Sequence, residues 1–251
     1  MLICVREQTN YVTLILVRKS YEGECKMRKL VLFMVISFVT LGLTLSSGTA
    51  SAEEVKNQYT PEDYINYLEH YDAQAARESG VSSEYIASAV IDAGKTLKDF
   101  KTLSKEEQQK FVDGFSQLET IKSSIREEKP EKANALASDK GVSYQGSVAF
   151  FGAPITTYKV SVNYKVDGGK VKKINSSNAF VVRNLNPVVR TGLNTGGKNA
   201  WVTSDNKAAV TGSFYYQIGP IKDVGVTVGN VFVKAVGDKN GKRTYKRFDI
   251  S

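Results

Sequence analysis

Residue types that commonly carry out chemistry are scarce in this chain of 251 residues. It has one histidine, His70, and two cysteines, Cys4 and Cys25. One histidine cannot form a histidine metal cluster, and a serine-histidine-aspartate site would have to use His70. The sequence also lacks the Gly-x-Ser-x-Gly pattern of a nucleophile elbow. We therefore expect His70 to be a half-exposed residue of a helix.

Carboxylates are the remaining candidates for acid-base chemistry. Glycoside hydrolysis needs two of them, and the first half of the chain offers Glu62, Asp63, Glu69 and Asp72. The second half offers Asp139, Asp167, Asp205, Asp223, Asp238 and Asp249, and three of these adjoin glycine or asparagine, as turn residues do. A secreted hydrolase that uses the helix carboxylates is the third of our functional hypotheses.

Two glycine-containing motifs match ligand-binding loops only in part. Residues 238–241, Asp-Lys-Asn-Gly, match the start of a calcium loop but lack its later acidic ligands and its closing glutamate. Residues 195–198, Thr-Gly-Gly-Lys, lack the spacing of a phosphate-binding loop. A hairpin turn is the better interpretation of the first motif. The sequence thus predicts no catalytic residue, no metal site and no cofactor.

The strongest functional signal is a secretory leader. Residues 27–29, Met-Arg-Lys, precede an apolar run over residues 30–45, and small residues follow as far as Ala50 and Ala52. A basic start, an apolar core and an Ala-x-Ala end are typical of a signal peptide, which predicts cleavage between Ala52 and Glu53. The apolar run is short for a membrane span, and no basic stop-transfer flank follows it. We therefore expect an extracellular protein, either free or associated with the cell wall.

Residues 1–26 precede this leader, so we expect translation to start at Met27 and these residues to be an upstream extension. The codons for Glu22, Gly23 and Glu24 are purine-rich, as a bacterial ribosome-binding site would be. Both cysteines lie in this extension. The expected mature chain therefore has no disulfide and no thiol nucleophile.

Charge divides the expected mature chain into two halves. The whole sequence carries a formal net charge of +8. Residues 53–135 hold 11 basic and 17 acidic side chains, a net of −6, whereas residues 136–251 hold 17 basic and 6 acidic, a net of +11. An abrupt shift in composition marks a boundary. We expect an acidic helical domain over residues 53–128, a linker over 129–140 and a basic domain over 141–251.

The acidic half has a helical period. Capping boxes begin at Thr60 and Ser104, and Ser82 or Ser83 can cap a further helix between them. Apolar residues recur every three or four positions after each cap. They are Tyr64, Leu68, Tyr71 and Ala75 in the first helix, Ile86, Ala89, Val90, Ala93, Leu97 and Phe100 in the second, and Phe111, Phe115, Leu118 and Ile125 in the third. Three helices with short connections predict a small antiparallel bundle.

The basic half alternates apolar and polar residues, which is the period of a strand with one buried face. The expected strands cover residues 147–151, 158–166, 171–182, 201–203, 208–218, 224–236 and 244–250. The sequence therefore predicts an α+β chain, in which a three-helix segment is followed by an antiparallel sandwich or small barrel of six to seven strands. Residues 184–199, which contain Pro187 and several glycines, are expected to be the longest loop and a mobile or ligand-binding element.

Basic and aromatic residues concentrate around two predicted hairpins of this half. The candidate binding residues are Lys159, Lys165, Lys170, Lys172, Lys173, Lys234, Lys242, Arg243, Lys246, Arg247, Tyr158, Tyr164 and Tyr245, with Lys239, Tyr215, Tyr216 and Phe248 among them. A strongly positive surface attracts polyanions, which outside a Gram-positive cell are wall polymers and anionic lipid headgroups. A merely soluble charged face is the alternative. Export makes nucleic acid an unexpected partner.

The leader and the helical-then-β layout resemble the broad class of small secreted proteins of Bacillus-like Gram-positive bacteria, among which bacteriocin-like antimicrobial proteins are one precedent. This resemblance covers the mature chain but transfers no site residues. Our leading hypothesis is a secreted non-enzymatic protein whose basic domain binds anionic envelope components, in one form a bacteriocin-like antimicrobial. A housekeeping cell-wall or matrix-binding protein is the second hypothesis. An intramolecular contact would let the acidic domain shield the basic one, as a pro-region does.

Overall fold

The computed structural model describes residues 7–8, 11–12, 59–127, 139–219 and 226–251. The chain divides into two units, Met1–Lys56 and Asn57–Ser251. In the first unit, β1 (Glu7–Gln8) pairs antiparallel with β2 (Tyr11–Val12). The expected signal peptide, its cleavage residues Ala50, Ala52 and Glu53, and most of the expected linker lie outside the described residues.

Short helices make up the first part of the second unit. They are α2 (Pro61–Glu69), α3 (Ala73–Glu78), the 3₁₀ turn η1 (Ser83–Tyr85), α4 (Ile86–Thr102), α5 (Lys105–Asp113), the 3₁₀ turn η2 (Gly114–Ser116) and α6 (Leu118–Ser123). Within the described residues, none of these helices has the length and apolar character needed to cross a membrane.

The helix ends follow the capping residues of the sequence. Thr60 is the N-cap of α2 and Ser104 is the N-cap of α5, each with the reciprocal hydrogen bonds of a capping box. The first expected helix is divided in two, because the Asp72 side chain accepts hydrogen bonds from the backbone N–H groups of Gln74 and Ala75 and begins α3.

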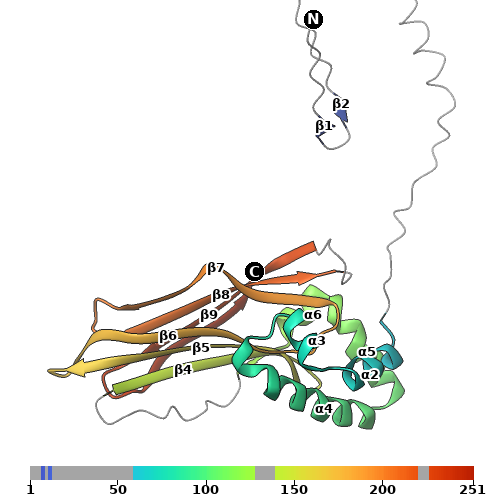
Figure 1. The fold of residues 1–251 in the computed structure, drawn as a ribbon, viewed down its shortest axis with the longest axis horizontal. Coiled ribbons are helices and arrows are strands. Elements are labelled where there is room, and N and C mark those ends of the chain that lie inside the picture. Colours follow the sequence, from blue (N-terminus) through green and yellow to red (C-terminus); the bar gives the residue numbers. More distant parts are fainter. Residues whose placement is uncertain (1–6, 9–10, 13–58, 128–138, 220–225) are drawn as a thin grey trace, which may run out of the picture. The chain divides into compact units, whose positions relative to one another are not determined.

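Two four-stranded antiparallel sheets form the larger part of the unit (Figure 1). The first sheet has the order β3-β4-β5-β6 and contains β3 (Ile125–Glu127), β4 (Asp139–Phe150), β5 (Ala153–Asp167) and β6 (Lys170–Asn184). The second has the order β10-β9-β8-β7 and contains β7 (Val189–Val202), β8 (Ala208–Ile218), β9 (Val226–Gly237) and β10 (Arg243–Ile250). The expected α+β class with antiparallel strands is confirmed. Seven of the eight strands, β4 to β10, lie in the basic half, as expected, and the eighth, β3, comes from the half that was expected to be helical.

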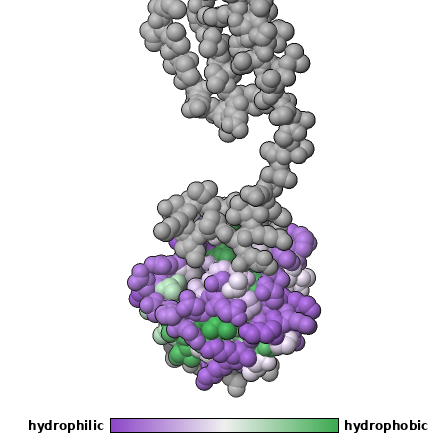
Figure 2. Space-filling model, turned by 90° about the vertical axis from the view of Figure 1, so that its right-hand side faces the viewer, coloured by the Kyte–Doolittle hydropathy of each residue, from purple (hydrophilic) through white to green (hydrophobic). Residues whose placement is uncertain are grey.

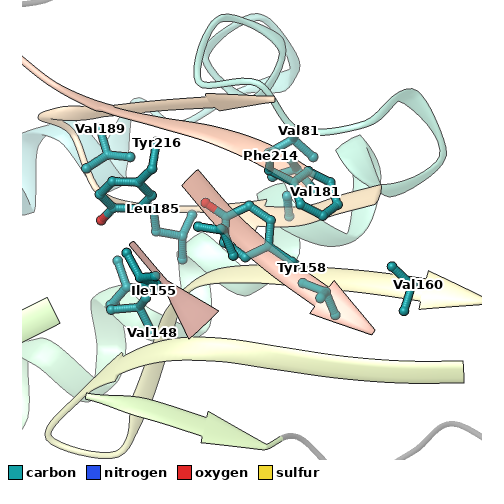
Figure 3. Close-up of a cluster of buried hydrophobic side chains, with 14 of the residues drawn as sticks. Val81, Val148, Ile155, Tyr158, Val160, Val181, Leu185, Val189, Phe214 and Tyr216 are labelled. Carbon is teal, nitrogen blue, oxygen red and sulfur yellow. The ribbon is translucent and has the colours of Figure 1, made fainter. Parts of the chain in front are cut away.

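The two sheets pack face to face and share a hydrophobic core. Tyr158 of β5 lies near the middle of this core, fully buried, with its ring 4.8 Å from that of Phe214 on β8 (Figure 3). Val160 of the first sheet faces Gly212 of the second so closely that a Cβ on Gly212 would lie 2.9 Å from the Val160 side chain. The glycine therefore lets the sheets approach each other at this point.

The helices lie against one end of the sheets (Figure 1). The fully buried ring of Tyr64 lies among the rings of Phe100, Phe111 and Phe115, and Phe115 also meets Phe150 at the end of β4. The helical core and the sheet core are thus one continuous apolar cluster. Seen from this end, the surface of the unit is mostly hydrophilic, with small separate hydrophobic areas (Figure 2).

Residues 184–199 are not a long loop, so this expectation is wrong. Asn184, Leu185, Asn186 and Pro187 form a buried corner between β6 and β7, and the strand β7 begins at Val189. Asparagine, proline and glycine are turn residues, which is why the sequence suggested a loop. In the structure the Asn186 side chain accepts a hydrogen bond from the backbone N–H of Val188 and donates one to the carbonyl oxygen of Phe115. These backbone groups are therefore hydrogen-bonded without water, which allows the corner to be buried.

Candidate functional site

Four of the predicted binding residues lie together on the hairpin of β5 and β6. Lys165, Lys170, Lys172 and Lys173 are all exposed, and Lys165 lies opposite Lys173 in the strand register. Among the described residues, no carboxylate lies within ion-pair distance of any of the four. These four lysines are therefore exposed without a direct ion pair, although Asp139 and Asp167 lie opposite Lys165 and Lys170 in the strand register.

Two further turns approach this hairpin. The Tyr164 hydroxyl of β5 donates a 2.6 Å hydrogen bond to the carbonyl oxygen of Asp238, at the turn between β9 and β10. The backbone N–H of Val171 bonds to the carbonyl oxygen of Asn206, in the turn between β7 and β8. These contacts bring three turns together at one end of the sheets.

We call this region the basic end. Its charged residues are Lys140, Lys165, Lys170, Lys172, Lys173, Lys207, Lys239 and Lys242, with Asp139, Asp167, Asp205 and Asp238. Eight lysines and four aspartates give a net charge of +4. Lys173 lies ten residues along β6 from Arg183, which pairs with Asp92 of α4 at 3.3 Å. At about 3.3 Å per residue, the basic end is thus about 30 Å from the helical end.

Two of the aspartates at the basic end stabilise turns. The Asp238 side chain accepts hydrogen bonds from the backbone N–H groups of Asn240 and Lys242, which confirms the predicted hairpin turn. Asp205 accepts a hydrogen bond from the Thr203 hydroxyl and pairs with Lys207 at 2.9 Å, and these partners hold the pKa of its carboxyl below the ordinary value. Both carboxylates therefore form hydrogen bonds or ion pairs within their own turns.

Two other predicted residues belong to a seam between the sheets. Glu127 at the end of β3 accepts hydrogen bonds from Arg243, at 2.5 Å, and from Lys246. Arg243 also donates to the carbonyl oxygen of Ser143 and lies over the ring of Tyr144. Arg243 and Lys246 therefore join β10 to the first sheet. The carboxylate of Glu127 neutralises part of their positive charge.

Lys234, Tyr245 and Arg247 lie on the outer face of the second sheet. The Lys234 ammonium is 5.4 Å from the ring centroid of Trp201 and 5.5 Å from that of Tyr245. Arg247 lies over the ring of Phe232 and contacts the carboxylate of Asp249. Trp201 and Phe232 were not among the predicted residues. The cations that they contact lie on other strands, and the sequence of one strand does not show which residues of another strand lie beside it.

The prediction that Tyr158 and Tyr164 are surface-binding residues is wrong. Both are fully buried between the sheets, because they lie on the inward face of the same strand whose outward face carries Lys165. Burial raises the pKa of Tyr164 to about 12. Lys159 does point outward, but it lies over the ring of Tyr85 from η1 and is partly covered there. The predicted single patch is therefore divided among separate places.

The helix carboxylates of the hydrolase hypothesis have structural partners. Asp63 and Asp72 cap α2 and α3, Glu62 pairs with Lys105 at 3.0 Å, and Glu69 pairs with Lys101 at 2.7 Å. These hydrogen bonds hold the pKa values of all four carboxyls below their ordinary values. A general acid needs the opposite shift, so these groups are poorly suited to that role.

His70 is exposed at the end of α2, with its Nδ1 atom 2.8 Å from the carbonyl oxygen of Asn66. Over the part of the chain that the structure describes, no group of three or more histidine, cysteine, aspartate and glutamate side chains could hold a metal ion.

Comparison with protein-family models, curated proteins and solved structures finds no match to this chain.

Proposed function

We propose that this is a secreted, non-enzymatic protein whose basic end binds an anionic component of the bacterial envelope. The observation that supports the proposal is the cluster of exposed lysines on the β5–β6 hairpin, which have no acidic partner among the described residues. Phosphate and carboxylate groups repeated along a wall polymer or on a lipid surface would meet several of these lysines together. The leader sequence would deliver the protein to that surface.

Electrostatics explains why the cluster would act as a unit. A lysine close to an anionic membrane surface contributes about 1 kcal/mol. The screening length at physiological salt is about 8 Å, so the hairpin lysines reinforce one another more than lysines spread over the protein would. Binding of this kind weakens as salt rises.

The test is sedimentation of the purified protein with isolated Gram-positive cell walls and, separately, with vesicles that contain phosphatidylglycerol. The triple variant Lys170→Gln, Lys172→Gln, Lys173→Gln should lose about a hundredfold in affinity, because three contacts of about 1 kcal/mol are removed. The control is Lys98→Gln, Lys105→Gln, Lys110→Gln, which removes the same charge from exposed positions of α4 and α5. Equal losses in both variants would show that net charge alone, and not the basic end, drives the binding.

The two materials distinguish the sources of the anion. Retention on walls but not on vesicles would assign wall polymers as the target, and the reverse would assign lipid. Growth inhibition of related strains by micromolar protein would favour the bacteriocin-like form of the proposal. Its absence would favour a housekeeping wall-binding or matrix protein.

The helical segment does not suit the role of a shield for the basic end. Its described contacts with the sheets lie at the opposite end, where Ser82 bonds to Val181 and Ser79 bonds to Thr191. We therefore propose that the intact chain from Glu53 to Ser251 is the active form. Mass spectrometry of the culture supernatant tests this, since an active fragment without the helical segment would contradict it.

A further inference from the structure

The outer face of the second sheet has an arrangement that the basic end does not explain. Trp201, Ala209, Val236 and Tyr245 lie side by side in one row across all four strands. Lys234 and Arg247 lie opposite each other in the next row. We call Trp201, Tyr215, Phe232 and Tyr245, with Lys234 and Arg247, the aromatic face.

Small residues lie beneath two parts of the aromatic face. Ala209 is fully buried beneath its larger neighbours, and the ring of Tyr215 lies so close to Gly192 of β7 that a Cβ there would be 2.7 Å from the ring. The ring of Tyr215 therefore lies against the backbone of β7. Trp201 and Tyr245 are three strands apart, which corresponds to about 14 Å at a strand spacing of about 4.8 Å.

A cation held between two rings is the central feature of this face. The Lys234 ammonium lies within 5.5 Å of the ring centroids of both Trp201 and Tyr245. In the described structure no carboxylate pairs with Lys234, whereas Arg247 contacts Asp249. The rings hold the ammonium by cation–π attraction and leave its remaining hydrogen-bond donors available.

We propose that the aromatic face binds a polysaccharide that contains acidic sugars. The apolar faces of sugar rings stack on flat indole and phenol rings, and a sugar carboxylate placed between them would pair with Lys234. An extended polymer crossing the strands would cover Trp201, Lys234 and Tyr245 in succession. This site shares no residue with the basic end, and it requires both the sugar ring and the acid group.

Trp201 provides the measurement, because it is the only tryptophan of the chain. Titration with oligogalacturonate should change the emission of Trp201 and protect it from quenching by acrylamide. Two probes separate the parts of the proposal: chito-oligosaccharide has sugar rings without acid groups, and polyglutamate has acid groups without sugar rings. Both should bind at least about tenfold more weakly, since each lacks one of the two contacts.

The variant Tyr245→Ala keeps the tryptophan reporter and should weaken oligogalacturonate binding by about tenfold. The variant Lys234→Gln should abolish the preference for oligogalacturonate over chito-oligosaccharide. The matched control is Phe151→Ala, since Phe151 is an equally exposed aromatic, 53% against 48% for Tyr245, on the turn between β4 and β5.

Several outcomes would overturn the proposal. They are an unchanged Trp201 signal with oligogalacturonate, an equal response to polyglutamate, and an equal loss in Phe151→Ala. Self-association that Tyr245→Ala abolishes would instead assign the face to contact between copies of the chain. The triple variant of the basic end should bind oligogalacturonate at the aromatic face normally, so the two proposals can fail separately.

Discussion

The Tyr71 hydroxyl donates a 3.0 Å hydrogen bond to the backbone carbonyl oxygen of Asn184, and this bond joins the helical segment to the sheets. The Asn184 side chain extends the connection, because its amide group donates to the carbonyl oxygens of Ser79 at 2.9 Å and Val189 at 2.8 Å. Its amide oxygen accepts a hydrogen bond from the Thr156 hydroxyl. Asn184 is fully buried, so the junction is specified by hydrogen bonds as well as by apolar contact.

Asn184→Ala should therefore be strongly destabilising. The change leaves four buried polar groups without this partner, since the backbone N–H of Asn186 also donates to the Asn184 amide oxygen, and we expect it to lower the free energy of unfolding by about 3 kcal/mol. Urea denaturation of both proteins measures the difference. Asn178→Ala on the exposed part of β6 is the control and should change stability by less than about 0.5 kcal/mol. Equal effects of the two variants would remove the special role of the junction.

The helices and the sheets should unfold together, because they share one apolar cluster. Far-ultraviolet circular dichroism reports mainly on the helices, and the fluorescence of Trp201 reports on the second sheet. The two signals should give coincident transitions in urea. Separate midpoints would mean that the two segments are independent domains, as the composition of the sequence alone suggests.

Alkaline pH should weaken the fold through buried tyrosines. Desolvation by burial raises the pKa of Tyr71 and of Tyr164 from 10.0 to about 12. The unfolded chain therefore loses these protons first, so the stabilisation is complete below pH 10 and is lost as the pH rises toward 12. Thermal unfolding across this interval should show a falling midpoint. In Tyr71→Phe the decline should be shallower, and an unchanged slope would contradict the assignment to Tyr71.

Two glycines should respond in opposite directions to replacement by alanine. A Cβ at Gly237 would lie 2.5 Å from a methyl group of Val142 and 2.7 Å from the Tyr164 hydroxyl oxygen, inside the core between the sheets. Gly237→Ala should cost about 1–3 kcal/mol through overpacking. Gly94 lies in α4 with no atom near its Cβ position, so Gly94→Ala should stabilise the protein by about 0.5–1 kcal/mol. Chemical denaturation gives both values, and a shared sign would contradict this reading of the two environments.

Local signals in the sequence predict local structure well. The capping pairs at Thr60 and Ser104 and the turn at Asp238 depend on residues a few positions apart, and all three form as expected. Alternation along residues 158–166 also separates buried from outward-facing positions. These features follow from neighbouring residues, so they need no knowledge of the tertiary structure.

The candidate surfaces depend on long-range contacts, and the sequence could not place them. The alternation shows that Tyr158 and Lys159 face opposite sides, but only the second sheet and the helices determine which side is covered. Glu127 neutralises part of the charge of Arg243 from more than one hundred residues away. Lys234 meets Trp201 across an intervening strand. A count of basic residues therefore predicts the charge of the β half but not its distribution.

The three residues of β3 have a consequence for the solubility of shortened forms of the chain. Ile125 and Glu127 pair with Val148 and Gly146, so a strand from the helical half covers residues 146–148 of the edge of β4. An uncovered strand edge is a template for pairing with another molecule. A truncated chain that begins after β3 would present this edge of β4, and we expect it to associate edge to edge into aggregates. In the intact chain the acidic half thus closes this part of the β4 edge.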